Sequence, residues 1–442
     1  MSLYLLWTDI MVWVLVLAGM AWGWKLSRSM EARRKLTVIF RSKVAMASAI
    51  ILLFYLMFAL LDSVHFKVTE SKNTHSGEIV SVLDMAFSHQ RDFSERTYSA
   101  PFATTEYAKS IVVDEAGVTR QAYLPLKHIS ASHSWQKVMG ALFLGVLLSL
   151  IPIGLHVFWR RKRMDESNIE SKLPWRTAYM TLGVLITLFT WLYVMSFSFH
   201  VLGTDKVGGD LFYASMKSIR TGVLIGILTT LVTLPLAIVL GVSAGFFRGW
   251  VDDLIQYLYT TLSSIPGVLL IAAGVLTMQV MMDQHPNWFA STVERSDLRL
   301  LFLILILGVT SWTGLCRLLR AETMRISRMD YVTAAKAFGV SRWRIMARHI
   351  VPNLTHIILI SVVLDFSGLV LAEAVLSYVG VGVDPTMYSW GNMINQARLE
   401  MAREPMVWWS LFSAFAFMFV LVLAANLFSD RVQHVLDPRN AQ

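Results

Sequence analysis

Long apolar stretches alternate with short, mostly basic polar segments along this chain of 442 residues. About twenty apolar residues cross the hydrocarbon core of a bilayer as a helix, so the pattern predicts an all-α polytopic membrane protein with about nine transmembrane helices. The first span is followed by bulky Trp24 and Lys25 instead of a small-residue cleavage site, which predicts a retained anchor and not a signal peptide. The expected spans are 3–24, 44–61, 138–159, 175–197, 222–246, 254–281, 300–318, 354–374 and 407–428.

Clusters of Lys and Arg give the expected topology, because such residues are enriched in cytoplasmic loops. They crowd 25–43, 160–172 and 317–348, and these loops share one side if the N-terminus is outside and the C-terminus is cytoplasmic. The polar segment 62–136 then lies outside as a small soluble insert, with strand-like pieces at 111–113 and 122–124. No motif in it indicates a role, so a passive spacer and a partner-binding domain both stay open.

The composition agrees with a membrane protein. Hydrophobic residues make up 55% of the chain and charged residues only 16%, against about a quarter in soluble domains. The net charge of +9 comes mainly from clusters beside the spans, which is an orientation signal and not a nucleic-acid patch. One cysteine, histidines without ligand spacing and no phosphate loop argue against a disulfide, a metal site or an ATP site. Any ATP-driven work would need another subunit.

The most informative polar segment is 331–353, which reads YVTAAKAFGVSRWRIMARHIVPN between two apolar spans. We expect Asp330 to cap a short Ala-rich helix, Gly339 to end it in a left-handed conformation, and Ser341 to cap a second helix. Pro352 then marks the passage into the next span. Such an element is typical of a docking surface for a cytoplasmic protein. An ordinary basic loop is the alternative, and attachment to the membrane on both sides argues against a DNA-binding helix–turn–helix.

Several motifs in the second half resemble one family. The outer run is Gly203-Thr204-Asp205-x-x-Gly208-Gly209-Asp210, and Ala372-Glu373-Ala374, Ser389-Trp390-Gly391-Asn392-Met393 and Leu436-Asp437-Pro438-Arg439 follow in order. Together with 331–353 they resemble the permease subunits of binding-protein-dependent ABC importers, closest to the C-type subunit of dipeptide and oligopeptide systems. The resemblance covers about 175–439. The segment 331–353 is similar to the EAA loop of that family, with Thr333 in place of the usual Glu and Gly209 in place of an Arg in the outer run.

The resemblance implies a permease that is not itself an enzyme and that carries no cofactor. ATP and Mg would be used by two partner ATPase subunits, beside a second homologous permease and an extracytoplasmic substrate-binding protein in a bacterial inner membrane. The implied cargo is a short peptide, with nickel chelates or oligosaccharides as alternatives. The expected outer-loop residues are Gly203, Thr204, Asp205, Gly208, Asp210, Trp390, Gly391 and Asn392. The expected ATPase contacts are Thr333, Ala334, Ala335, Lys336, Gly339, Arg342, Arg344, Arg348 and Pro352, although the arginines could instead face lipid headgroups.

Three residues within the spans are candidates for the translocation pathway. Asp365 lies near mid-span, where a carboxylate costs about 3 kcal/mol, so it should face protein or water. An interhelical hydrogen bond and a pathway acid that favours cationic substrates are both open, and Glu373 has the same alternatives. Pro266 should kink or break its span, for gating or for packing. An ion-coupled secondary transporter, with these acids carrying protons, is the alternative of another class, but the internal repeats of such carriers are not seen. A membrane sensor ranks last.

The expected domain organisation has four parts. Residues 1–61 form a two-helix membrane extension, 62–136 the insert, and 137–174 a third helix with a basic loop. Residues 175–442 form the importer permease core of six helices, which contains the coupling loop 331–353.

Overall fold

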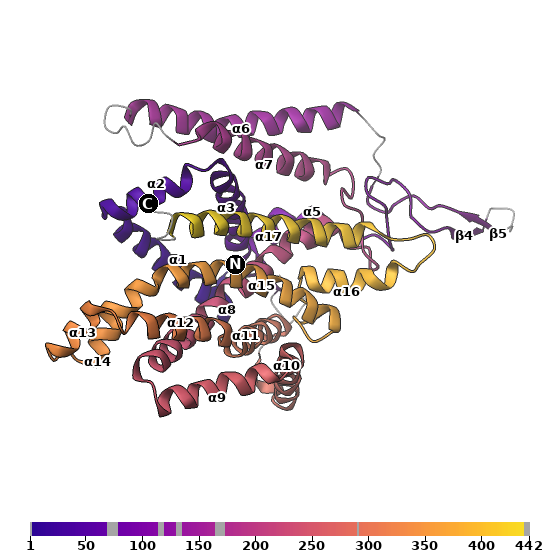
Figure 1. Ribbon diagram of the computed structural model, residues 1–442. Helices are drawn as coiled ribbons and strands as arrows, with labels where there is room; N and C mark the ends of the chain where they lie inside the picture. Colours follow the sequence, from indigo (N-terminus) through magenta and orange to yellow (C-terminus); the bar gives the residue numbers. More distant parts are fainter. Residues whose placement is uncertain are drawn as a thin grey trace. The chain divides into compact units, whose positions relative to one another are not determined.

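The computed structural model describes residues 2–68, 78–113, 119–129, 135–163, 173–289 and 291–436. Helices make up most of the described chain (Figure 1), so the predicted all-α class is confirmed. The chain divides into two compact units. Unit 1 comprises Met1–Leu5, Val12–Val223 and Met387–Phe428, and unit 2 comprises Leu6–Met11, Leu224–Thr386 and Ser429–Gln442.

Eight helical stretches in the described residues are long and apolar enough to cross a membrane. A shorter apolar stretch, Trp7–Ala21, corresponds to the first predicted span, so the predicted number of nine is close. The eight are Lys43–Asp62, Trp135–Arg161, Trp175–Met195, Leu211–Phe247, Gly267–Gln284, Thr292–Ile326, Arg342–Val379 and Trp409–Val435.

Unit 1 is built around a group of packed helices, in which α6 lies along α7 and α3 also packs against α7. In Figure 1 the pairing of α6 and α7 is visible along most of their length. α1 begins in unit 2, and α8 and α17 continue into it. The helices of unit 1 are α1 (Trp7–Ser27), α2 (Met30–Phe40), α3 (Lys43–Asp62), α4 (Val82–Ala86), α5 (Ser88–Arg91), α6 (Trp135–Arg163), α7 (Trp175–Met195), α8 (Leu211–Phe247), α16 (Trp390–Glu400) and α17 (Trp409–Leu436).

The start of α8 differs from the prediction. From the sequence, the amphipathic run 211–220 is expected as a short interfacial helix ahead of the predicted span 222–246. In the structure α8 runs unbroken from Leu211, since nothing between these segments interrupts its hydrogen bonds and Asp210 caps its first turn. The amphipathic run is therefore the buried first part of a long helix.

Two small sheets lie in unit 1. β1 (Ser2–Tyr4), β2 (His65–Val68) and β3 (Glu78–Ser81) form an antiparallel sheet, and β4 (Ser110–Val113) pairs with β5 (Thr119–Ala122) as a hairpin. The prediction that the first span begins at residue 3 is wrong, because those residues pair with β2 before the helix begins. The second predicted strand is displaced, since its pairing ends at residue 122.

Unit 2 contains the remaining helices. The predicted span 254–281 is two helices, because Ile265 is extended and Pro266 supplies no backbone N–H at the junction. The predicted break at Pro266 is thus confirmed, while the single span across it is wrong. The helices are α9 (Trp250–Ser264), α10 (Gly267–Gln284), η2 (Pro286–Trp288), α11 (Thr292–Ser311), α12 (Thr313–Ile326), α13 (Asp330–Ala337), α14 (Arg342–Ile345), η3 (Met346–Ile350) and α15 (Val351–Val379).

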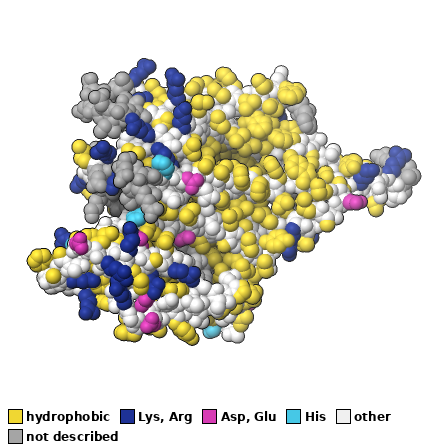
Figure 2. All heavy atoms as spheres, viewed as in Figure 1, with side chains coloured by type: hydrophobic (Ala, Val, Ile, Leu, Met, Phe, Trp, Pro, Cys, Tyr) yellow, Lys and Arg dark blue, Asp and Glu magenta, His cyan; other side chains and the backbone are white. Residues whose placement is uncertain are grey.

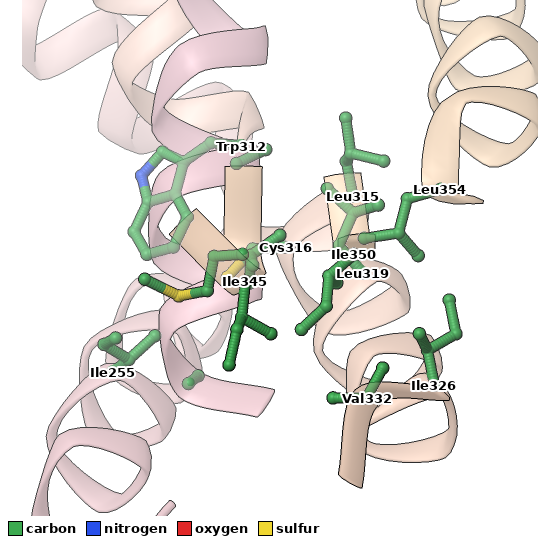
Figure 3. Packing of buried hydrophobic residues seen from close by; sticks show 14 of the residues in the cluster. Ile255, Trp312, Leu315, Cys316, Leu319, Ile326, Val332, Ile345, Ile350 and Leu354 are labelled. Carbon is green, nitrogen blue, oxygen red and sulfur yellow. The ribbon is translucent and has the colours of Figure 1, made fainter. Parts of the chain in front are cut away.

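The hydrophobic core of unit 2 gathers around α12. Cys316 and Leu319 are fully buried in it and meet residues of α8, α9, α13 and the start of α15. Figure 3 shows these side chains from several helices converging on one another. This cluster holds the polar segment 331–353 against the membrane helices.

Candidate functional site

The segment predicted as a helix–turn–helix folds as one. α13 ends at Gly339, whose φ of 72° is left-handed. The Val340 N–H then donates to the Ala335 carbonyl oxygen at 3.1 Å, the hydrogen bond of a Schellman cap. A glycine adopts this backbone without the penalty that a Cβ brings. The predicted role of Gly339 in the turn is confirmed.

The ends of the two short helices differ in detail from the expectation. The residue in the N-cap position of α13 is the extended Met329, and Asp330 lies one residue later, where its charge favours the positive helix end. Ser341 does occupy the N-cap position of α14, but its side chain makes no capping hydrogen bond. α14 continues through a π-helical turn, η3, directly into α15. The second helix is thus the entry to a membrane span.

One face of this element is anchored in the core. Val332 and Ile345 are fully buried and pack in the cluster with Cys316 and Leu319 of α12. Ala335, expected at the ATPase contact, is also buried and belongs to this inner face. The Ala-rich helix is therefore fixed by its apolar residues and cannot swing free of α12 without exposing them.

The opposite face is exposed and carries two large aromatic residues that the sequence argument overlooked. Phe338 is 87% exposed and Trp343 is 68% exposed, beside the Gly339 turn. Figure 2 shows Lys and Arg side chains gathered over the same end of unit 2. Eight of the expected contact residues are exposed, namely Thr333, Ala334, Lys336, Gly339, Arg342, Arg344, Arg348 and Pro352.

A partly buried ion pair stabilises this end of unit 2. Arg320 of α12 donates to both carboxylate oxygens of Asp252 in α9, at 2.5 and 2.8 Å. The planar guanidinium matches the carboxylate with two parallel hydrogen bonds. This pair ties the start of α9 to α12, and the sequence argument did not identify it because the two residues are 68 positions apart.

The three candidate pathway residues have different surroundings. Asp365 is half-buried in α15, and its carboxylate has no hydrogen-bond or ion-pair partner among the described residues. Glu373, by contrast, is buried and accepts a hydrogen bond from the Ser377 hydroxyl at 2.7 Å. Pro266 is exposed at the junction of α9 and α10. Only Asp365 is a mid-span charge without compensation in the described chain.

The outer run 203–210 forms a tight loop in unit 1. Asp205 accepts hydrogen bonds from the backbone N–H groups of Val207 at 2.9 Å and Gly209 at 2.8 Å. Asp210 caps α8 by accepting from the Phe212 N–H at 2.8 Å. Both aspartates therefore organise backbone, as short polar side chains do in turns and at helix starts.

The insert covers this loop directly. The Glu95 N–H donates to the Gly208 carbonyl at 3.0 Å, and the Thr204 N–H donates to the Ser99 carbonyl at 3.1 Å. A Cβ on Gly208 would lie 2.0 Å from the Glu95 carbonyl oxygen, and the φ of Gly208 is 78°. Gly208 is needed because the insert backbone approaches so closely. The insert is thus packed directly against the outer run.

A buried histidine lies between the two parts. His200 Nδ1 is 2.7 Å from Asp210 Oδ2, and His200 Nε2 is 3.5 Å from Glu95 Oε1. Glu95 also accepts from the backbone N–H groups of Lys127 and His128 at 2.6 and 2.9 Å. Burial acts to lower the pKa of His200, but the two carboxylates outweigh it, so the pKa lies above its ordinary value. This cluster joins the insert to the cap of α8.

A second buried cluster joins the insert to α8 itself. The Lys217 ammonium contacts the carboxylate of Asp84 and lies 3.3 Å from that of Asp62. The Tyr213 hydroxyl donates to Asp84 at 2.7 Å. Burial acts to raise the pKa of Asp84, yet the Lys217 charge dominates and holds it below the ordinary value. The charges of α8 are therefore compensated by residues of the preceding insert.

The second outer motif is mostly internal. Ser389 caps α16 by accepting from the Asn392 N–H at 3.0 Å. Trp390 is almost fully buried and donates from Nε1 to the Ser215 carbonyl at 3.2 Å, and Gly391 and Asn392 are buried beside it. The terminal motif 437–439 lies outside the described residues. No group of His, Cys, Asp or Glu that could hold a metal was found in the described part of the chain.

Two of the comparisons, with a family model and with curated sequences, point to one family of proteins. The model of the binding-protein-dependent transport system inner membrane component matches residues 237–442. The glutathione transport system permease protein GsiD of Pectobacterium atrosepticum is 30% identical over 55% of this chain and 73% of its own length. The oligopeptide transport system permease protein OppC of Mycobacterium bovis is 30% identical over 54% of this chain and 76% of its own. A solved structure of the MetNI methionine ABC transporter in inward-facing conformations aligns with 51% of this chain and 97% of its own chain. The identity is 13% and the TM-score 0.41.

Proposed function

This chain belongs to the family of inner-membrane permease components of binding-protein-dependent ABC importers, and we propose from that premise that it forms the membrane path of an importer of short peptides. It is a multi-pass membrane protein and not an enzyme, since ATP hydrolysis in this family occurs in separate ATPase subunits. The proposed assembly adds a second permease, two ATPases using ATP and Mg, and an extracytoplasmic binding protein. The N-terminus lies outside and the C-terminus inside the cytoplasm.

The observation that carries the proposal is the exposed face of α13 and α14. Phe338 and Trp343 offer apolar contact area beside the shallow surface of Ala334, and exposed arginines surround them. Aromatic and arginine side chains are the usual anchors of protein–protein contacts. We infer that this EAA-like face docks into a groove of the ATPase subunit, with the basic rim meeting acidic groups.

Motion of that face can reach the membrane through one continuous path. α14, η3 and α15 follow one another without a loop, so a displacement of the docked element is applied directly to a helix of 29 residues. The buried contacts with α12 keep the element and its span together. We propose that ATPase closure shifts the balance between outward-open and inward-open arrangements by this route.

The proposed cargo class rests on two points. The matched relatives are named as permeases for glutathione and oligopeptides. The carboxylate of Asp365 lies mid-span without a partner among the described residues, where a cationic amino group of a passing peptide would compensate it. Glu373 and Pro266 are proposed to shape the path, Glu373 by holding the outer end of α15 through Ser377 and Pro266 as a hinge between α9 and α10.

Gly339→Asp tests the coupling role. Nothing lies within 4 Å of a Cβ at this position, so the cost is the left-handed backbone alone, about 1–2 kcal/mol. We expect normal membrane insertion, with peptide uptake lost and ATP hydrolysis no longer coupled to it. Gly380→Asp is the matched control, because Gly380 also has a left-handed φ, 87°, with open space around it, at the other end of α15. Unchanged peptide uptake in Gly339→Asp would contradict the proposal.

A further inference from the structure

The hairpin β4–β5 presents apolar side chains on one face. Alternate residues of a strand share a face, and cross-strand partners share it too. Ile111 and Val113 lie on one face, 72% and 63% exposed, and Tyr123 continues it at 54% exposed. The Lys109 ammonium lies 5.6 Å from the centre of the Tyr123 ring. We call this surface the hairpin face, and its described residues are Lys109, Ile111, Val113, Thr119, Gln121 and Tyr123.

The base of the hairpin is held by contacts within unit 1. Below the strands, the Glu106 N–H donates to the Leu124 carbonyl at 2.8 Å. The Tyr107 ring packs edge-on against Trp409 at the start of α17, with 4.7 Å between ring centres, and its hydroxyl donates to the Met406 carbonyl at 3.2 Å. The root of the hairpin is therefore tied to the start of α17 by an aromatic contact and to the segment before it by a hydrogen bond.

The hairpin face should meet water and not lipid. Figure 1 shows the hairpin extending beyond the ends of α6 and α17 within unit 1. The opposite end of α6 carries Arg160 and Arg161, which mark the cytoplasmic side by the positive-inside rule. Exposed apolar side chains on a two-stranded ribbon with free edges are costly in water and are a typical site of protein association.

We propose that the hairpin face binds the soluble substrate-binding protein of this importer. In the assembly proposed above, the ATPases dock at the cytoplasmic ends of the spans and the second permease lies in the membrane. The binding protein alone reaches the outer side as a soluble protein. Exposed Lys109 adds positive charge to this face, while Glu106 at the base of the hairpin is buried against Arg96, so the partner surface should carry acidic groups around an apolar patch. This inference rests on the proposed function and on its orientation.

Site-specific photo-crosslinking in native membranes is the first test. A photoreactive amino acid at Ile111 should crosslink the full-length importer to a soluble substrate-binding protein identified by mass spectrometry. The control is Ala122, which is exposed on the opposite face of the same hairpin. Equal crosslinking from both positions, or products containing only lipid or a second copy of this chain, would overturn the inference.

The second test measures the interaction with purified components. The double variant Ile111→Glu with Val113→Glu changes only exposed side chains, so the fold should survive. In the assembled importer in lipid nanodiscs, we expect unchanged basal ATP hydrolysis and a roughly tenfold higher concentration of the crosslinked binding protein for half-maximal stimulation. An unchanged concentration refutes the role of the hairpin face while the importer function stands. A purified complex without ATPase subunits refutes the proposed function itself, before any hairpin variant is compared.

Discussion

Replacing His200 tests whether a buried imidazole holds the insert on the outer run. His200→Gln keeps a hydrogen-bond donor of similar size but removes the positive charge between Asp210 and Glu95. Their side chains are almost completely buried. Removing one partner of a buried ion pair costs about 3–5 kcal/mol. Because each carboxylate keeps its backbone N–H donors, we expect a cost at the lower end of this range, about 3 kcal/mol. The equilibrium constant for local opening of the contact should then rise roughly a hundredfold.

The same cluster gives a pH dependence with a definite sign. The folded-state pKa of His200 is raised above its ordinary value by Asp210 and Glu95 against the opposing effect of burial. A group with a raised folded pKa contributes stability that is fully present below its unfolded pKa, about 6.5, and is lost as pH rises through the folded pKa. The attachment of the insert should therefore weaken on the alkaline side. The nearby Asp205 and His89 also titrate, with pKa values that burial raises and lowers respectively.

Hydrogen exchange measured by mass spectrometry on the protein in nanodiscs reports how often the contact between the insert and the outer run opens. The Phe102 N–H donates to the His200 carbonyl at 3.0 Å and the Thr204 N–H to the Ser99 carbonyl at 3.1 Å, so both amides report opening at the contact. Protection corrected for intrinsic exchange should fall in the native chain as pH rises above about 6.5. In His200→Gln it should be low throughout.

The matched control is His128→Gln. His128 is exposed, its ring stacks on Phe93 with 5.0 Å between centres, and only its backbone contacts Glu95. It should leave the protection unchanged. Protection that is independent of pH in the native chain and equal in His200→Gln would refute the reasoning.

Three further predictions concern packing and cargo. Gly208→Ala places a methyl 2.0 Å from the Glu95 carbonyl, so we expect at least about 2 kcal/mol lower stability of the attachment, read by the same exchange assay. Lys217→Met leaves Asp84 facing another carboxylate without a cation and should lower the thermal midpoint of the purified protein, at a cost of about 3–5 kcal/mol. Asp365→Asn should reduce the uptake of free-amino peptides relative to N-acetylated ones by roughly tenfold.

Controls for these variants come from positions without the same contacts. Gly140→Ala is the control for Gly208→Ala, because it adds a methyl where nothing lies within 4 Å. Lys206→Met is the control for Lys217→Met, because it removes an exposed lysine in the outer run 203–210. Neither should change stability by more than about 0.5 kcal/mol. An uptake ratio unchanged by Asp365→Asn would contradict the cationic-cargo proposal, whatever the absolute uptake.

Hydropathy and local backbone rules predicted the membrane helices and the turn within the segment 331–353. Span length, the break at Pro266 and the left-handed Gly339 depend on properties of neighbouring residues, so they can be read from the sequence directly. The start of α8 could not be predicted in this way. The charge of Lys217 fits an interfacial helix better than a buried one, and only the fold shows that Asp62 and Asp84 neutralise it, although Asp84 lies 133 positions away.

The same limit applies to the candidate sites. Glycine and aspartate residues in the outer run 203–210 indicate a turn from sequence alone. The part of the insert that packs on this run is distant in sequence, with 105 positions between Ser99 and Thr204, and no local pattern links Glu95 to His200. Exposure is also a property of the fold. Nothing in the local sequence shows that Phe338 and Trp343 lie outside while Val332 and Ile345 of the same segment are fully buried.

The lysine buried between two aspartates has a consequence for how this permease could have acquired or could lose its insert. Removing 62–136 as a module would strip Lys217 of both counter-charges and leave an ammonium in an apolar helix. A viable chimera without the insert would have to replace Lys217 in the same step, and a chimera that receives the insert would have to supply the lysine. The two segments are therefore expected to be inherited together, and grafting experiments should exchange them as a pair.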